Sequence, residues 1–290
     1  MTEYGYSAGG LNVTNVTTTE KYDDINNTWT IKADLNTARY SLIGFSLKGY
    51  GYTAGGDAGP ITEKYDSVLN IWSTKQNIIN NRYLLTGFSL NNYGYTSGGY
   101  VWSSATERYD DSADIWENKS NLNIARSGLA GFSLKGYGYT ATGDTSITYD
   151  SSTEKYDDTT NTWTIVSNVI SARKFLSGIS LNLYGYIFGG FVGYNMSNVE
   201  KYDDTNNTWT TKSSLNTGRY GLTSFNINNL VYITNGQANS GITTSTEKYD
   251  DITNTWTIVS NSNTSRNFLS GFSLSTPIAC PPIICNLSVM

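Results

Sequence analysis

The chain has 290 residues, a formal net charge of −5 and a sequence pI near 4.8. Because an acidic surface repels the nucleic-acid backbone and anionic membranes, we expect no nucleic-acid partner and no membrane insertion. Aromatic residues make up 13% of the chain, beside 28 Gly and 4 Pro, a composition typical of β-strands and tight turns.

The start of the chain, MTEYGYSAGG, holds neither a basic region nor an apolar run, and no 18-residue apolar segment follows it. The chain as given therefore predicts no signal peptide and no transmembrane segment. We expect a soluble protein, and its compartment stays unknown.

Six copies of one pattern fill the chain: Tyr-Gly-Tyr-x-x-Gly-Gly, Thr-Glu-Lys-Tyr-Asp, a Trp and an Arg. From the repeat Glu to the next Arg is 19 residues in all six copies, and from that Arg to the second Gly of the next Gly-Gly position is 17 in all five complete cases. The segment between Gly-Gly and Glu holds 9, 6, 7, 10, 9 and 10 residues in turn, so the period of 43 to 47 residues varies only there. This pattern indicates a repeat scaffold with one variable loop per repeat.

The second copy shows the predicted elements in chain order. Residues 40–47 and 50–54 predict two strands joined by the turn Lys48-Gly49. After the variable loop, residues 62–65 and 71–74 predict a third and a fourth strand, separated by an Asp-rich turn. Four antiparallel strands repeated six times predict an all-β, six-bladed propeller.

The two ends of the chain are complementary, because it opens on a second strand (Tyr4 to Tyr6) and closes on a first strand (267–275). We expect the C-terminal strand to complete the N-terminal blade and so to remove two open edges. The predicted domain is residues 1–275, followed by a tail, 276–290, outside the repeat. Cys280 and Cys285 lie in this tail, either as a disulfide or as two free thiols.

These motifs resemble the kelch family over about residues 4–275: Gly-Gly ends the second strand, Tyr-Asp ends the third, Asn-x-Trp enters the fourth, and Arg precedes the next first strand. Thr142-Gly143 and Asn235-Gly236 depart from Gly-Gly, which indicates local repacking. The resemblance implies that the loop after Gly-Gly and the loop before the first strand emerge on one face, around the mouth of a central channel.

The repeated Trp, Glu and Arg residues are predicted to be structural. Six equal Glu–Arg separations are typical of one ion pair per blade, whereas catalysis needs a single constellation. The chain has no His, which excludes Ser-His-Asp and Cys-His catalysis and His-ligated metals. We therefore predict no enzyme, no metal site and no cofactor.

Recognition residues are expected beside the variable loops, because loops on a rigid scaffold are where binding usually resides. Aromatic, acidic and amide side chains on such a rim suit a peptide groove or stacking against sugars. The candidate ligand-binding residues are Tyr40, Asp57, Tyr83, Tyr100, Trp102, Asp144, Lys174, Phe191, Tyr194, Tyr220 and Gln237.

The leading hypothesis is a non-catalytic recognition scaffold that binds a protein segment or a glycan through the variable loops around the channel mouth. One alternative is a structural or assembly component, such as a surface or particle protein, which docks through its tail or its loop face. A second alternative is a carbohydrate-active enzyme, against which the absence of His argues.

Overall fold

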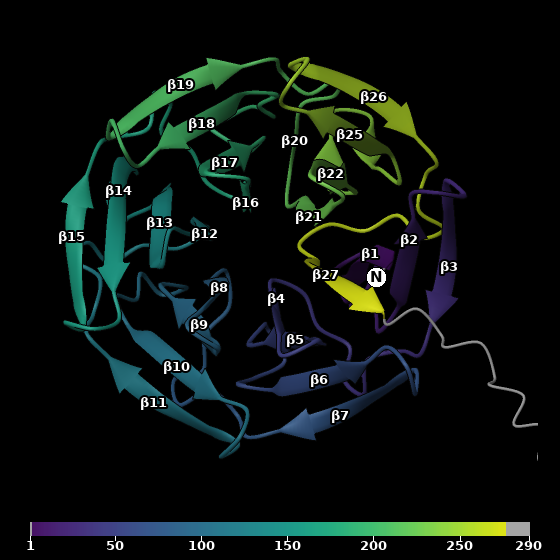
Figure 1. The fold of residues 1–290 in the computed structure, drawn as a ribbon, viewed down its shortest axis with the longest axis horizontal. Helices are drawn as coiled ribbons and strands as arrows, with labels where there is room; N and C mark the ends of the chain where they lie inside the picture. Colours follow the sequence, from purple (N-terminus) through teal and green to yellow (C-terminus); the bar gives the residue numbers. More distant parts are fainter. Residues whose placement is uncertain (1, 277–290) are drawn as a thin grey trace, which may run out of the picture.

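The computed structural model describes residues 2–276. In this part of the chain the strands form sheets arranged as a ring around a central opening (Figure 1). Six sheets have four strands each, and a seventh has three very short strands. The predicted all-β propeller of four-stranded antiparallel sheets is confirmed. Between residues 2 and 276 there is no helix long and apolar enough to cross a membrane.

Each four-stranded sheet corresponds to one sequence repeat, and its strands follow from the inside of the ring to the outside. Sheet 1 is β27 (Ser270–Thr276), β1 (Thr2–Ala8), β2 (Thr19–Asp23) and β3 (Thr28–Lys32). Sheet 2 is β4 (Ile43–Leu47), β5 (Tyr50–Ala54), β6 (Thr62–Asp66) and β7 (Ile71–Lys75). Sheet 3 is β8 (Thr86–Leu90), β9 (Tyr93–Ser97), β10 (Thr106–Asp110) and β11 (Ile115–Lys119).

The remaining sheets repeat this order. Sheet 4 is β12 (Ala130–Leu134), β13 (Tyr137–Asp144), β14 (Tyr149–Asp157) and β15 (Thr162–Val166). Sheet 5 is β16 (Ser177–Leu181), β17 (Tyr184–Phe188), β18 (Val199–Asp203) and β19 (Thr208–Lys212). Sheet 6 is β21 (Thr223–Ile227), β22 (Leu230–Thr234), β25 (Thr246–Asp250) and β26 (Thr255–Val259). The short sheet is β20 (Arg219–Tyr220), β23 (Gln237–Ala238) and β24 (Gly241–Ile242).

Sheet 1 is built from both ends of the chain. Strand β27 pairs antiparallel with β1 from Thr2 opposite Thr276 to Ala8 opposite Ser270. The strand thus includes Thr276, one residue beyond the predicted end of the domain. The rest of the predicted tail, with Cys280 and Cys285, lies outside the described residues.

Aromatic side chains fill the space between neighbouring sheets. Phe272 of sheet 1 stacks on Tyr6 with ring centroids 5.3 Å apart, and it meets the edge of Trp72 of sheet 2 at 6.1 Å. A Cβ atom at Gly51 would lie 2.2 Å from the Phe272 ring, so the middle Gly of Tyr-Gly-Tyr makes room for this contact. The Trp72 indole N–H donates to the Ala33 carbonyl of sheet 1 at 3.0 Å. The Trp column is therefore inter-blade packing, as predicted.

Two tyrosines per repeat are buried in this core, one from Tyr-Gly-Tyr or its counterpart and one from Lys/Arg-Tyr-Asp. Burial raises the pKa of each of their hydroxyls. These residues are Tyr6, Tyr22, Tyr52, Tyr65, Tyr95, Tyr109, Tyr139, Tyr156, Tyr186, Tyr202, Tyr232 and Tyr249.

Removal of residues 267–290 is expected to open the ring, because it deletes β27 together with the buried Leu269, Phe272 and Leu274. Loss of three large apolar side chains, each worth about 2–5 kcal/mol, exceeds the whole stability of many domains. We expect an insoluble protein or one that melts without cooperativity, measured by circular dichroism. A chain that ends at Thr276 is the control, and equal melting of the two truncated chains would contradict ring closure.

The buried tyrosines predict a steep loss of stability in alkali. Burial raises the pKa of Tyr65 and of Tyr202 to about 12, whereas tyrosine in the unfolded chain titrates near 10. A raised pKa contributes stability that is complete below about pH 10 and is lost as the pH climbs toward the folded-state value. Each such tyrosine lowers the free energy of unfolding by about 1.4 kcal/mol per pH unit in this window. The melting temperature should collapse between about pH 10 and 11, and a flat profile there would contradict the prediction.

Candidate functional site

The repeat Arg is buried in every sheet and ties together three parts of the repeat. Arg39 donates to the Gly55 carbonyl at 3.1 Å, to the Thr53 hydroxyl at 2.7 Å and to the carboxylate of Glu63. Burial lowers the pKa of the repeat guanidinium groups, and the partner carboxylates oppose this shift. Each repeat Arg forms an ion pair with a repeat Glu, but the partner is the Glu across the variable loop, 24 to 28 residues later in five of the sheets, and not the Glu that precedes the Arg by 19 residues. The pairs are Arg39–Glu63, Arg82–Glu107, Arg126–Glu154, Arg173–Glu200, Arg219–Glu247 and Arg266–Glu20.

The residue after this Arg meets the residue after Gly-Gly in every sheet. In sheet 3, the Tyr100 N–H donates to the Tyr83 carbonyl at 2.7 Å. We call this end of the ring the variable-loop face. Its pairs are Leu11–Asn267, Tyr40–Asp57, Tyr83–Tyr100, Ser127–Asp144, Lys174–Phe191 and Tyr220–Gln237.

The residue two positions after each Arg forms a closed ring of backbone hydrogen bonds, which we call the mouth ring. Each N–H donates to the carbonyl of the equivalent residue in the preceding sheet, over 2.7 to 3.1 Å. All six residues have a φ between 51° and 62°, which is uncommon for residues other than glycine. The ring thus holds four non-glycine residues in a left-handed conformation. Its members are Ser41, Leu84, Gly128, Phe175, Gly221 and Phe268.

Five aromatic side chains at this mouth form a connected cluster, which we call the aromatic platform. Its closest ring contacts are Phe191–Tyr220 at 5.1 Å and Phe175–Phe268 at 5.2 Å. The ring centroid of Phe268 also lies 5.8 Å from that of Tyr220 and 6.2 Å from that of Tyr40. All five are half-buried. The sequence prediction included Tyr40, Phe191 and Tyr220 but missed Phe175 and Phe268, whose mouth-ring column has no shared residue type.

A second aromatic group lies at sheet 3. Tyr83 and Tyr100 have ring centroids 4.9 Å apart, and Trp102 lies 6.0 Å from Tyr100. Tyr100 is exposed, and burial raises the pKa of Tyr83. The Trp102 indole nitrogen is buried and has no hydrogen-bond partner among residues 2–276. The structure therefore brings these three predicted residues together.

The predicted polar residues mostly hold the loops in place. Lys174 forms an ion pair with Asp144 at 2.9 Å. Asp57 accepts hydrogen bonds from the Tyr40 N–H at 2.8 Å and from the Asn15 amide at 2.7 Å. The Gln237 amide donates to the Ala238 carbonyl at 2.9 Å.

Tyr194 stands apart from both aromatic groups. Its side chain is 64% exposed and makes no ring contact with another described residue. Two polar atoms that the sequence did not single out lie at the mouth instead. The Ser41 hydroxyl and the Asn267 amide oxygen are buried and lack a hydrogen-bond partner in the described part of the chain. Buried polar groups normally have partners, so these two atoms are exceptions in the core beneath the mouth.

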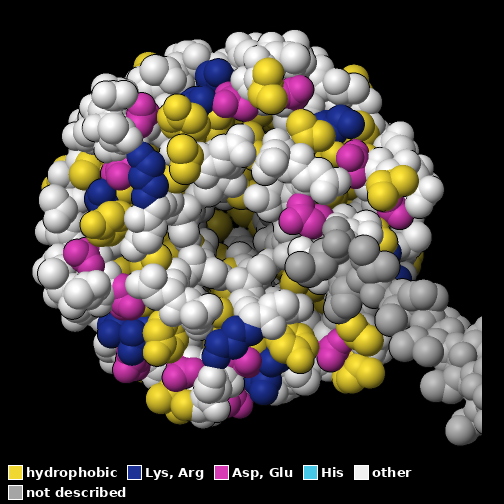
Figure 2. Space-filling model, viewed as in Figure 1, with side chains coloured by type: hydrophobic (Ala, Val, Ile, Leu, Met, Phe, Trp, Pro, Cys, Tyr) yellow, Lys and Arg dark blue, Asp and Glu magenta, His cyan; other side chains and the backbone are white. Residues whose placement is uncertain are grey.

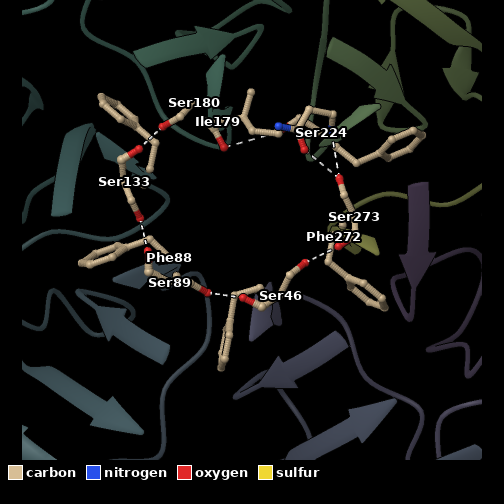
Figure 3. Close-up of a pocket in the computed structure, with 18 of the residues that line it drawn as sticks. Ser46, Phe88, Ser89, Ser133, Ile179, Ser180, Ser224, Phe272 and Ser273 are labelled. Carbon is tan, nitrogen blue, oxygen red and sulfur yellow. Dashed lines mark hydrogen bonds between the residues drawn. The ribbon is translucent and has the colours of Figure 1, made fainter. Parts of the chain in front are cut away.

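The central channel behind the mouth ring has a cavity of about 420 Å³. Its wall is made mainly of glycine, serine and phenylalanine residues on the innermost strands, and Glu3 is the one charged residue among those lining the cavity. The Ser89 hydroxyl donates to the Ser46 carbonyl and the Ser46 hydroxyl to the Ser273 carbonyl, both at 2.5 Å (Figure 3). Asn226 takes the place of serine in sheet 6. These hydroxyls are therefore already used in linking neighbouring sheets.

The end of the ring opposite the variable-loop face, where β27 ends, shows the opening of this channel, surrounded by charged side chains of both signs (Figure 2). Between residues 2 and 276, no three His, Cys, Asp or Glu residues are grouped so that they could hold a metal ion. Asp150, a carboxylate beside a variable loop, binds Arg126 at 2.6 Å. The two aromatic groups of the variable-loop face can stack against a ligand, and the polar side chains beside them can donate or accept hydrogen bonds.

Comparisons with known proteins agree with this geometry. The family model of the Kelch motif matches residues 186–216 and 218–263, in the fifth and sixth repeats. The solved structure of YjhT is similar, with a TM-score of 0.72 at 16% sequence identity, over 87% of this chain and 96% of that chain. No curated protein matches the sequence.

Loss of one buried carboxylate should destabilise the ring strongly. Glu107→Gln leaves the Arg82 guanidinium buried without its charge partner, and we expect a loss of about 3–5 kcal/mol in the free energy of unfolding. The matched control is Glu117→Gln in the same sheet, because Glu117 is 43% exposed in its pair with Arg108. Glu117→Gln should lower the free energy of unfolding by less than about 1 kcal/mol. Equal effects of the two variants in urea denaturation would contradict the structural role of the buried pair.

Proposed function

We propose that this chain, a β-propeller whose fifth and sixth repeats match the Kelch motif, is a non-catalytic recognition module. It binds a protein segment or a glycan across the variable-loop face. The observation that carries this proposal is the aromatic platform, whose five half-buried rings line one side of the mouth of the channel. Flat apolar rings on a preformed support give a large contact area at little cost in side-chain entropy.

The support of these rings is rigid. Phe175 and Phe268 are members of the mouth ring, so backbone hydrogen bonds to both neighbouring sheets fix their Cα positions. Tyr40 and Tyr220 directly follow the buried Arg39 and Arg219. A surface that is already ordered loses little entropy when a ligand binds.

Polar groups beside the platform provide direction for a ligand. The unpartnered Ser41 hydroxyl and Asn267 amide oxygen lie just beneath the surface where sheets 1 and 2 meet at the mouth, so a ligand reaches them only when a neighbouring side chain moves. A few polar groups within an apolar surface are what orients a ligand in most binding sites. Peptide amides and sugar hydroxyls both supply the matching donors.

The absence of catalysis is part of the proposal. Each repeat Glu and Arg is paired with the other in its own sheet, and Asp150 and Asp144 are paired with Arg126 and Lys174. A general acid or base needs a carboxyl group that can reach the substrate. Asp57, the exposed carboxylate of the rim, is held by a backbone N–H and an amide.

The test is a triple variant, Tyr100→Ala, Trp102→Ala and Phe191→Ala, which removes rings from both aromatic groups. The wild-type protein is screened on a glycan array and against a displayed peptide library, and the Kd of each hit is measured. We expect the triple variant to bind the hits at least about 30-fold more weakly, because aromatic anchors at interface centres are worth about 2 kcal/mol or more.

The matched control removes three exposed apolar side chains from turns between the third and fourth strands, at the other end of the ring: Ile25→Ala, Val68→Ala and Ile252→Ala. Binding by this control should equal that of the wild type. Unchanged affinity of the aromatic triple variant would reject the proposal, and so would the absence of any wild-type hit in both the glycan array and the peptide library. Melting temperatures of all three proteins show whether each is folded.

A further inference from the structure

A cation from one sheet reaches an aspartate of the next sheet at five of the six junctions. The cation comes from the third strand, at the Lys of Glu-Lys-Tyr-Asp, and the carboxylate is the second Asp of the neighbouring Asp-Asp turn. The pairs are Lys64–Asp111 at 3.0 Å, Arg108–Asp158 at 3.5 Å, Lys155–Asp204 at 2.8 Å, Lys201–Asp251 at 2.8 Å and Lys248–Asp24 at 3.5 Å.

The sixth junction, between sheets 1 and 2, lacks this carboxylate. Lys21 is the cation there, and Ser67 stands where the other sheets have the second Asp. Lys32, at the end of β3, is the second lysine that faces this junction. Within residues 2–276, neither Lys21 nor Lys32 forms an ion pair, and the Lys21 ammonium lies over the Tyr4 ring at 3.8 Å.

The junction between sheets 5 and 6 shows what a complete version looks like. There the Asp251 carboxylate lies between two ammonium groups, 2.8 Å from Lys201 and 3.1 Å from Lys212. These lysines occupy the positions of Lys21 and Lys32 in their own sheet. Burial opposes ionisation of Asp251, yet the hydrogen bonds of these lysines hold its pKa below the usual range.

Hydroxyl groups complete the site. In the junction between sheets 2 and 3, the Tyr52 hydroxyl donates to Asp111 at 2.5 Å. Its counterpart at the sixth junction is Tyr6, whose pKa is raised by burial, while a hydrogen bond with the Ser67 side chain acts in the opposite direction. Two ammonium groups and two hydroxyls therefore face the position that a carboxylate occupies elsewhere.

The missing charge has an electrostatic consequence. The pKa of Lys21 is lowered by burial and by the positive charge of Lys32, and Asp23 only partly compensates. Asp23 and Asp66, the first aspartates of the two turns, cap backbone N–H groups as their counterparts do in the other sheets. The sixth junction thus lacks the carboxylate that the other five have, and it keeps the second lysine, which is a valine (Val166 and Val259) at two of them.

We propose that the junction between sheets 1 and 2 binds a small oxyanion of the phosphate or sulfate type, held by Lys21, Lys32, Tyr6 and Ser67. Several donors around one point suit an oxyanion, because each of its oxygens accepts more than one hydrogen bond. Lys21, Lys32 and Ser67 are half-buried, so the site is open to solvent while its charges are only partly screened. This site is independent of the proposed recognition face.

The test compares the full-length protein in about 20 mM sodium phosphate and in sodium chloride of equal ionic strength and pH, so that general screening cancels. We expect phosphate to raise the melting temperature by about 2–3 °C, as ligand binding to the folded state requires. Calorimetric titration with inorganic phosphate should give one site per chain. Equal melting temperatures in the two salts would overturn the proposal.

Two variants identify the site. Ser67→Asp supplies the carboxylate that the other five junctions have, so it should raise the melting temperature in chloride and abolish the response to phosphate. Asp251→Ser is the matched counterpart, because it creates the same vacancy between Lys201 and Lys212 and should give two phosphate sites per chain. If Asp251→Ser does not fold, Ser67→Asp still decides: an undiminished phosphate response in that variant would overturn the assignment.

Discussion

The buried guanidinium of each repeat is the contact on which the variable-loop face depends. Arg39 reaches the end of the second strand through Gly55, the third strand through Glu63 and its own loop through the Thr37 carbonyl. A charge buried at this depth is stable only when its donors are satisfied and its partner is fixed. The network therefore fixes the segments on both sides of the variable loop, so the interval from Arg to Gly-Gly is constant while the loop between Gly-Gly and the paired Glu can differ in length.

The mouth ring follows from the same contact. Once the Arg is fixed, the chain has three residues in which to turn into the innermost strand, and the second of them takes a left-handed conformation in every sheet. Its N–H and carbonyl then point to the neighbouring sheets and close the ring. The six sheets are therefore linked at the mouth by backbone groups, which leaves the side chains there free to differ. That freedom allows Phe175 and Phe268 to occupy a position that is Gly128 or Gly221 in other sheets.

How far the sequence could predict the structure depends on the kind of signal. Repeated columns, such as those of Trp72 and Glu63, report a shared environment, and their structural role could be read from regular spacing alone. The mouth ring could not be predicted from the sequence, because a backbone hydrogen bond does not require a particular residue type. Its column holds Ser, Leu, Gly and Phe. Ser67 is visible in the sequence as an interruption of the Asp-Asp column. The consequence of this interruption, however, depends on Lys21 and Lys32, which lie near Ser67 only because sheets 1 and 2 pack together.

A scaffold of near-identical repeats can bind one ligand in one orientation only where the repeats differ. The platform residues come from four consecutive sheets: Phe175 and Phe191 from sheet 5, Tyr220 from sheet 6, Phe268 from sheet 1 and Tyr40 from sheet 2. Sheet 3 adds the separate group around Tyr100, whereas sheet 4 contributes small and polar residues at the equivalent positions, Ser127, Gly128 and Asp144. The rim is thus aromatic along most of its circumference and polar at one sector. Six-fold repetition supplies rigidity, and this asymmetry is what the proposed recognition of a peptide or a sugar requires for one defined direction across the mouth.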